Sequence, residues 1–126
     1  MNTFRSPLYL AVITLALAIS ASSVVASPPT AEKVLADAQA TASKEGKAIF
    51  LHFGASWCGW CKKLDAFMAQ PEIKPVFEKY FVPVTLVVQE NEKNKALENP
   101  GGDEVLKKIG GPEGLPFLAF PTPRAN

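Results

Sequence analysis

The chain has 126 residues, enough for one domain, and its 13 basic and 12 acidic side chains give a formal net charge of +1. Arg5 is the single charged residue before residue 27, so residues 27–126 carry equal numbers of positive and negative side chains. This balance gives no indication of nucleic acid or an anionic surface as a partner. The two cysteines are too few for a disulfide scaffold.

Residues 1–26 have the pattern of a cleaved secretory signal peptide. Arg5 supplies the positive charge, residues 8–19 form the apolar stretch, and small residues precede a cleavage point after Ala26. The apolar stretch is about a dozen residues long, whereas a membrane span needs about 20, so a cleaved signal is favoured over an anchor. We therefore expect an exported protein, periplasmic or secreted, whose domain is residues 27–126 and which keeps no stable membrane anchor.

The exported part of the chain alternates helices with strands, which predicts an α/β layered fold. Thr30 is expected to cap the first helix and Gly46 to end it. The predicted helices are 31–44, 58–69, 75–80 and 103–109, the last capped by Asp103, and the predicted strands are 47–55, 81–88 and 117–120. The polar residues 89–103 are expected to form a solvated connection with a helical turn near 93–97.

Apolar side chains with the spacing of buried faces define the predicted core. The second short helix is expected to bury Val76, Phe77 and Tyr80. The remaining core positions are predicted to be Phe50, Phe53, Leu64, Phe67, Leu86, Phe117 and Phe120.

Both cysteines lie between a predicted strand and a predicted helix, in the run Trp57-Cys58-Gly59-Trp60-Cys61. Cys58 falls at the first residues of the helix, where unpaired backbone N–H groups and the helix dipole stabilise a thiolate and lower the thiol pKa. Cys61 lies one turn further on the same face, close enough to form a disulfide with Cys58. Such a dithiol can pass a disulfide to another protein or take one from it.

The segment Phe53-Gly54-Ala55-Ser56-Trp57-Cys58-Gly59-Trp60-Cys61-Lys62 resembles the active-site segment of the thioredoxin-like family, and of its small exported bacterial members in particular. The resemblance covers most of residues 31–121. It implies a thioredoxin-like three-layer α/β fold and a thiol–disulfide oxidoreductase that acts on protein disulfides. Cys58 would be the attacking thiolate and Cys61 the resolving thiol. The dithiol itself is the redox group, so no organic cofactor or metal is implied, but a redox partner must reset it.

His52, the only histidine, lies six residues before Cys58. Thioredoxins usually carry a buried acid there that exchanges protons with the second thiol. A histidine could act as that proton acceptor, because its pKa lies near neutrality. The alternative is a strand histidine that is hydrogen-bonded to the backbone and has no catalytic role.

The resemblance also implies a substrate-binding surface around the cysteines. Trp57 matches a family position that shields the thiol and contacts substrate, and Gly59 and Trp60 separate the two cysteines. Trp60 replaces the proline or histidine that is common there, and it either contacts a peptide or packs on the rim. Gly114-Leu115-Pro116-Phe117 lies where the family has a cis proline, so a cis Leu115–Pro116 bond is expected, with the Leu115 backbone available to a bound peptide.

The chain departs from the family after Pro116, because only ten residues follow it. The last antiparallel strand and the closing helix of the family are therefore expected to be missing. This predicts a three-stranded sheet in which residues 117–120 form an exposed edge, and hence low stability or self-association through that edge.

Two alternative functions stay open. Soft thiolates bind Cu(I), so a thioredoxin-like copper carrier is one, although such carriers usually space their cysteines further apart and add a distant histidine. An inactive truncated remnant is the other. A zinc site needs four ligands, and haem attachment needs a histidine where Lys62 follows Cys61, so neither is expected.

Overall fold

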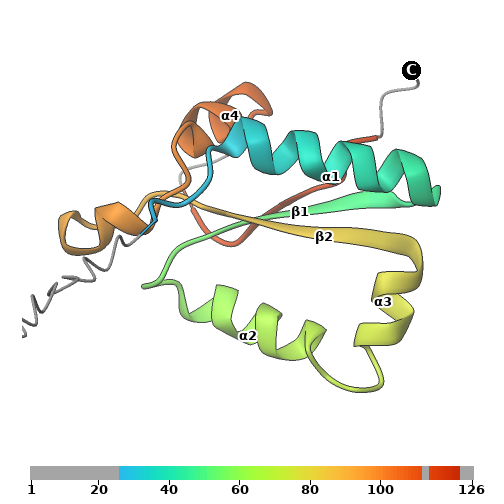
Figure 1. Ribbon diagram of the computed structural model, residues 1–126. Coiled ribbons are helices and arrows are strands. Elements are labelled where there is room, and N and C mark those ends of the chain that lie inside the picture. Colours follow the sequence, from blue (N-terminus) through green and yellow to red (C-terminus); the bar gives the residue numbers. More distant parts are fainter. Residues whose placement is uncertain (1–25, 112–113, 123–126) are drawn as a thin grey trace, which may run out of the picture.

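The computed structural model describes residues 26–111 and 114–122, which form a three-stranded sheet with helices on both faces (Figure 1). The elements in chain order are α1 (Ala31–Glu45), β1 (Ala48–Gly54), α2 (Gly59–Met68), α3 (Lys74–Tyr80), β2 (Phe81–Val87), the 3₁₀ helix η1 (Glu92–Leu97), α4 (Gly102–Lys108) and β3 (Phe117–Ala119). The predicted α/β fold, its element order and its three-stranded sheet are confirmed.

The signal peptide expected in residues 1–26 lies, apart from Ala26, outside the described residues. None of the helices in the described ranges is long and apolar enough to span a membrane.

Strand β1 lies at the centre of the sheet, between β2 and β3. It pairs in parallel with β2, from Ala48 opposite Phe81 to Gly54 opposite Val87. It pairs antiparallel with β3 through residues 51–53. All of β1 except Ala48 is buried, as its apolar sequence predicted. Because β1 and β2 are parallel, their carboxyl ends meet at one edge of the sheet.

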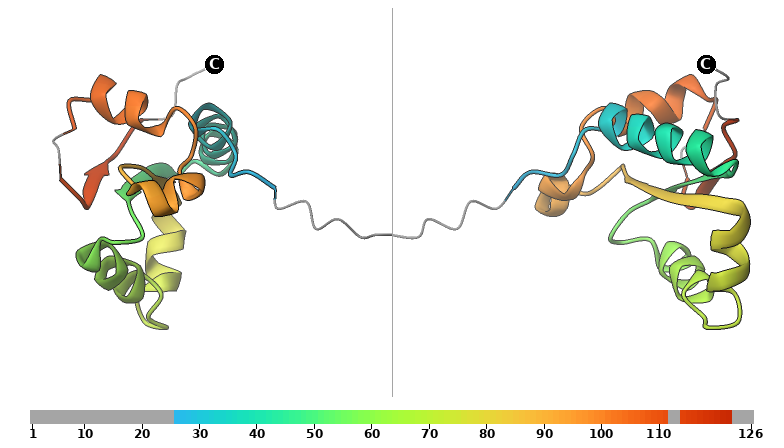
Figure 2. Two further views of the ribbon diagram at one scale, coloured as in Figure 1. Left: turned by 90° about the vertical axis from the view of Figure 1, so that its left-hand side faces the viewer. Right: turned by 45° about the vertical axis from the view of Figure 1, so that its right-hand side comes forward.

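One face of the sheet is covered by α1 and α4, as Figures 1 and 2 show. Alternate β1 residues Ile49, Leu51 and Phe53 point to this face and belong to the main hydrophobic core. The small Ala38 and Ala42 of α1 belong to the same core, and small side chains let a helix pack closely on a sheet. The predicted limits of α1 are confirmed, since the Thr30 hydroxyl accepts a hydrogen bond from the Lys33 N–H and Gly46 ends the helix with φ +65°.

The opposite face of the sheet is covered by α2 and α3 (Figure 2). An aromatic cluster attaches α3 to this face. Phe50 of β1 meets Phe77 of α3 edge to face, with 4.7 Å between ring centroids, and Phe120 at 5.4 Å. Phe81 stacks on Phe77 at 5.0 Å. This face is less completely covered than the other, because Pro83 and Thr85 of β2 are exposed on it.

The core prediction was wrong for residues of this less covered face. Phe67 and Phe120 are 51% and 57% exposed, and Val76 and Tyr80 of α3 are 60% and 55% exposed. The physical reason is that three strands offer too little apolar surface to cover all the large apolar side chains of α2, of α3 and of the residue that follows β3. The other predicted core residues are buried or half-buried.

The predicted cap of α4 was also wrong. Gly101 is the N-cap residue, with a left-handed backbone at φ +82° that glycine adopts without strain, and Asp103 lies in the first turn instead. A carboxylate there still interacts favourably with the helix dipole.

The expected cis peptide bond between Leu115 and Pro116 is present. It leads into β3, which is an edge strand of the described sheet and pairs only with β1 there. Self-association through this edge stays a prediction.

We predict that Phe50→Ala lowers the free energy of unfolding by about 3–5 kcal/mol, because the ring is 6% exposed and lies at the centre of the aromatic cluster. Urea denaturation at equilibrium measures this loss. Val76→Ala, at the exposed side of α3, is the matched control and should change the free energy of unfolding by about 0.5 kcal/mol or less. Equal effects of the two substitutions would contradict a stabilising role for the cluster.

Candidate redox-active site

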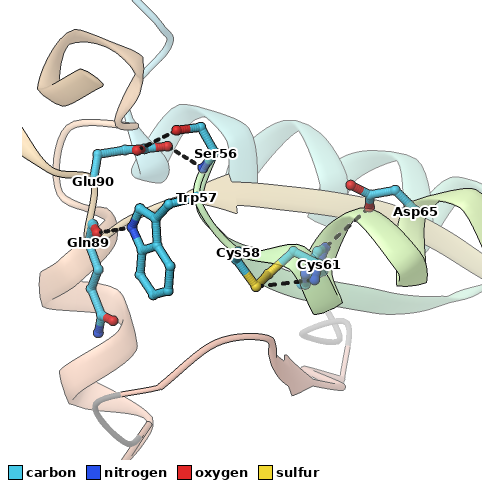
Figure 3. Close-up of a disulfide and its surroundings, with 8 residues drawn as sticks. Ser56, Trp57, Cys58, Cys61, Asp65, Gln89 and Glu90 are labelled. Atoms are coloured by element: carbon cyan, nitrogen blue, oxygen red, sulfur yellow. Dashed lines mark hydrogen bonds and ion pairs between the residues drawn. A yellow bond between two sulfur atoms is a disulfide. The ribbon is translucent and has the colours of Figure 1, made fainter. Parts of the chain in front are cut away.

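The two cysteines form a disulfide at the junction of β1 and α2 (Figure 3). The S–S distance is 2.12 Å and the Cα atoms are 5.3 Å apart. Cys58 is the N-cap residue of α2, and its Sγ accepts a hydrogen bond of 3.1 Å from the Cys61 backbone N–H. The sulfur of Cys58 therefore takes the place of the oxygen that usually caps a helix.

This position makes the two sulfurs chemically unequal. After reduction, the unpaired N–H groups and the positive end of the helix dipole favour a thiolate at Cys58, whereas Cys61 lies within the first turn. Both cysteines are 3% exposed and pack against Ala55 and Leu115. A substrate must therefore pass the residues packed around Cys58 to reach its sulfur.

His52 lies on β1 behind the disulfide and is 2% exposed. Its Nδ1 is 3.6 Å from an Asp65 carboxylate oxygen, and within the described residues neither ring nitrogen has a hydrogen-bond partner. The expected alternative of a histidine held by backbone hydrogen bonds is therefore wrong for the described part of the chain, and the role of His52 stays a prediction. An unpaired buried polar group is uncommon and is often associated with catalysis or a bound water.

Gly54 lies beside both His52 and Cys61, and it has no side chain to separate them. A Cβ atom added to Gly54 would lie 3.3 Å from His52 Nε2 and 3.5 Å from Cys61 Sγ. The imidazole and the Cys61 sulfur therefore lie against the same side of Gly54.

Burial lowers the pKa of His52 below its ordinary value, and the Asp65 carboxylate opposes this shift in part. The imidazole is therefore neutral at pH 7 and able to accept a proton. Asp65 is 60% exposed, so water screens its charge.

Two exposed tryptophans are close to the cysteines in the sequence. Trp57 is 51% exposed, and its indole N–H donates a hydrogen bond of 2.8 Å to the Gln89 carbonyl (Figure 3). Trp60 is 68% exposed, and the Lys63 ammonium lies 4.2 Å from its ring centroid as a cation–π contact. Trp60 is thus available to a partner, and Gly59 between the cysteines is exposed as the first residue of α2.

The segment before β3 reaches the disulfide from far along the chain. Leu115 is half-buried against both cysteines, whereas Pro116 is exposed. The fold therefore brings the predicted substrate-binding residues Leu115 and Pro116 to the side of the Cys58–Cys61 pair.

A group of polar residues beside the site was not predicted from the sequence. The Ser56 N–H and hydroxyl donate to the two carboxylate oxygens of Glu90, and the hydroxyl bond is 2.8 Å (Figure 3). Glu90 and Asn99 are 7% and 8% exposed, so the prediction of a solvated connection was wrong at these residues. A usable signal existed, because polar residues that follow neighbouring parallel strands meet at the same edge of a sheet.

No set of three histidine, cysteine or acidic side chains is arranged to hold a metal ion in residues 26–111 and 114–122.

We predict that the oxidised protein loses stability as the pH falls from about 7.5 to 5, and that His52→Gln removes much of this dependence. Because the folded state lowers the pKa of His52, the unfolded chain binds the proton more readily and acid favours unfolding. Each unit by which the two pKa values differ corresponds to about 1.4 kcal/mol. Urea titrations at several pH values measure the effect, and parallel curves for both proteins would contradict it.

The chain was compared with known proteins. A family model described as thioredoxin-like matches residues 30–123. No curated protein matches significantly. The solution structure of a thioredoxin from Thermus thermophilus is 24% identical, with a TM-score of 0.53, over 79% of this chain and 66% of the thioredoxin. The C-terminal domain of DsbD from Neisseria meningitidis, crystallised in the oxidised form, is 23% identical, with a TM-score of 0.52, over 75% of this chain and 76% of that domain.

At these identities the solved structures show the fold alone, and the chain spans slightly less than two thirds of the Thermus thioredoxin. The family model covers most of the chain and includes both cysteines. A disulfide in a Cys-x-x-Cys motif on this fold supports oxidoreductase chemistry in general terms. The chain therefore belongs to the thioredoxin-like family.

Proposed function

We propose that this protein is a thiol–disulfide oxidoreductase that exchanges disulfides with protein substrates in an exported compartment, through Cys58 and Cys61. The observation that carries the proposal is the Cys58 sulfur at the N-cap of α2, bonded to Cys61 Sγ and hydrogen-bonded by the Cys61 N–H. A purely structural role explains this arrangement poorly, because a disulfide that closes so short a loop stabilises a fold only weakly.

The exchange proceeds in two steps. The reduced protein presents Cys58 as a thiolate, which attacks one sulfur of a substrate disulfide, and the other substrate sulfur leaves as a thiolate that takes a proton from water. Cys61 then loses its proton and attacks Cys58 Sγ. The mixed disulfide breaks, the second substrate sulfur is released, and two electrons have passed to the substrate. The protein is left with the Cys58–Cys61 disulfide.

A dithiol partner must reduce this disulfide before the next cycle, and the same steps in reverse oxidise a substrate dithiol. The signal-like pattern of residues 1–26 supports export, and exported compartments are oxidising. A reductive cycle in that setting therefore requires an external supply of electrons.

His52 is the proposed proton acceptor of the second step. Its neutral imidazole faces Cys61 across Gly54, so it can take the Cys61 proton directly or through one water molecule. Asp65 at 3.6 Å from Nδ1 then stabilises the imidazolium that forms.

Protein substrates are proposed because the surface around the disulfide suits a peptide. Trp57 and Trp60 expose aromatic surface on either side of Cys58, and exposed tryptophan is enriched at protein interfaces. The backbone at Leu115, beside the cis bond to Pro116, offers polar groups to an extended chain.

We predict that Cys61→Ser forms a stable mixed disulfide with a disulfide-containing protein, because Cys58 can attack but no second thiol releases the product. Cys58→Ser should form almost none. Non-reducing gels and mass spectrometry detect the adduct, and the wild-type protein should turn over the same substrate. A wild-type protein that retains one Cu(I) ion and never exchanges with glutathione would contradict the proposal and favour the copper carrier.

We predict that His52→Ala slows the second step by about 100-fold near neutral pH, because general bases typically contribute a factor of that order. Release of product from a preformed mixed disulfide is followed by stopped flow between pH 6 and 8. The first step, attack by Cys58, is the internal control and should keep its rate. An unchanged release rate across this pH range would contradict the role of His52.

A further inference from the structure

Two pairs of neighbouring residues connect the redox site to the segment that follows β2. Ser56 and Trp57 precede Cys58, and Gln89 and Glu90 follow β2, separated from its end by Val88 alone. Three hydrogen bonds join these pairs: two from Ser56 to the Glu90 carboxylate and one from the Trp57 indole to the Gln89 carbonyl. Figure 3 shows the Trp57 ring between this junction and the disulfide. The residues just before the attacking cysteine are therefore held in place by the segment that follows β2.

Glu90 is the centre of this junction. It is 7% exposed, and no salt bridge reaches its carboxylate from the described part of the chain. The Ser56 hydroxyl also accepts from the Asn94 side-chain amide at 2.8 Å, and the Glu90 N–H donates to Glu98 at 2.7 Å. Burial of a carboxylate without a cation raises the free energy of the folded state unless hydrogen bonds compensate the lost hydration. The hydrogen bonds to the Glu90 carboxylate therefore favour one arrangement of Ser56 and Glu90.

The backbone beside Glu90 indicates the same constraint. Gln89 has φ +53°, in the left-handed region that side chains other than glycine seldom adopt. Such a conformation costs about 1 kcal/mol or more and persists where its surroundings fix it. At Gln89 the neighbouring Glu90 is anchored to Ser56, and the Gln89 carbonyl accepts from the Trp57 indole.

We infer that Glu90 is a positioning residue, which fixes Trp57 beside the Cys58–Cys61 disulfide and thereby favours protein disulfides over small ones. The inference rests on the proposed function. Glu90 contacts neither sulfur and acts through Ser56 and Gln89. A protein disulfide must align its backbone along the Trp57 surface before Cys58 reaches its sulfur. A small disulfide needs access to the sulfur alone, so its rate does not depend on how Trp57 is held.

The test compares Glu90→Ala and Glu90→Gln with Glu92→Ala. Glutamine restores an acceptor for the Ser56 N–H, so it should recover most of the wild-type behaviour. Glu92 is an exposed carboxylate in the first turn of η1, so its removal controls for loss of a negative charge in the same segment. The first readout is hydrogen exchange of the Trp57 indole N–H by NMR, with the signal assigned from Trp60→Phe. This readout does not require activity.

We expect Glu90→Ala to speed exchange of the Trp57 indole N–H at least tenfold. It should also raise the KM for a protein disulfide about tenfold, while kcat and the rate with oxidised glutathione stay within about twofold of the wild type. Glu92→Ala should match the wild type in every readout. The remaining amide signals in the same spectra report whether the fold is kept.

Unchanged indole exchange in Glu90→Ala would overturn the inference, because Trp57 would then be held without Glu90. Equal slowing with protein and small disulfides would overturn it as well, since the defect would lie in the cysteine chemistry. If the wild-type protein reacts with neither kind of disulfide, the proposed function fails and the preference for protein disulfides fails with it. The indole exchange still decides whether Glu90 positions Trp57.

Discussion

The parallel pairing of β1 with β2 is the constraint on which the rest of the site depends. It sets Gly54 opposite Val87, so the chain leaves both strands at the same edge of the sheet. The residues that follow β1 carry the disulfide, and those that follow β2 carry Gln89 and Glu90. A shift of one residue in this register would turn the core face of β1 outward and would separate Ser56 from Glu90. The pairing of β1 with β2 therefore both orients the core side chains and brings the residues of the redox site together.

The alternation of side chains along β1 explains why a histidine is buried behind the disulfide. Ile49, Leu51 and Phe53 face the core under α1, so Phe50 and His52 face α2 and α3. On that face Phe50 is enclosed by aromatic rings, and His52 lies between the sheet and Asp65 of α2. Burial there destabilises the charged imidazole and lowers the pKa of His52. The packing of this face therefore makes His52 a base that is neutral at pH 7.

Much of the fold could be predicted from the sequence, because the relevant signals are local. Thr30 and Gly46 mark the limits of α1, the apolar run of β1 predicts a central strand, and the position of Cys58 between strand and helix predicts its place at the helix end. The exposure of Phe67 and Phe120 could not be predicted in this way. Their neighbours in the sequence are typical of a core, and only the small area of the three-stranded sheet leaves them uncovered.

The residues of the candidate site also differ in whether local sequence signals indicate them. The cysteines and His52 can be proposed from the sequence because a motif and a fixed spacing within one strand–helix unit indicate them. Glu90 was missed because its neighbours in the sequence are polar, and its burial results from contact with Ser56, 34 residues earlier in the chain. A polar segment is exposed on average. A single residue within it can still be buried where a long-range hydrogen bond satisfies its polar group.

The redox balance of the cysteine pair depends on the groups that surround Cys58. The end of α2 and the Cys61 N–H favour a Cys58 thiolate, and so favour the reduced protein. The Glu90 carboxylate accepts two hydrogen bonds from Ser56 and contacts neither sulfur, so its influence on the pair passes through the position of Trp57. His52 adds no positive charge while it is neutral. Local helix geometry thus favours reduction, so the helix end that positions Cys58 also influences the tendency of the pair to give or take electrons.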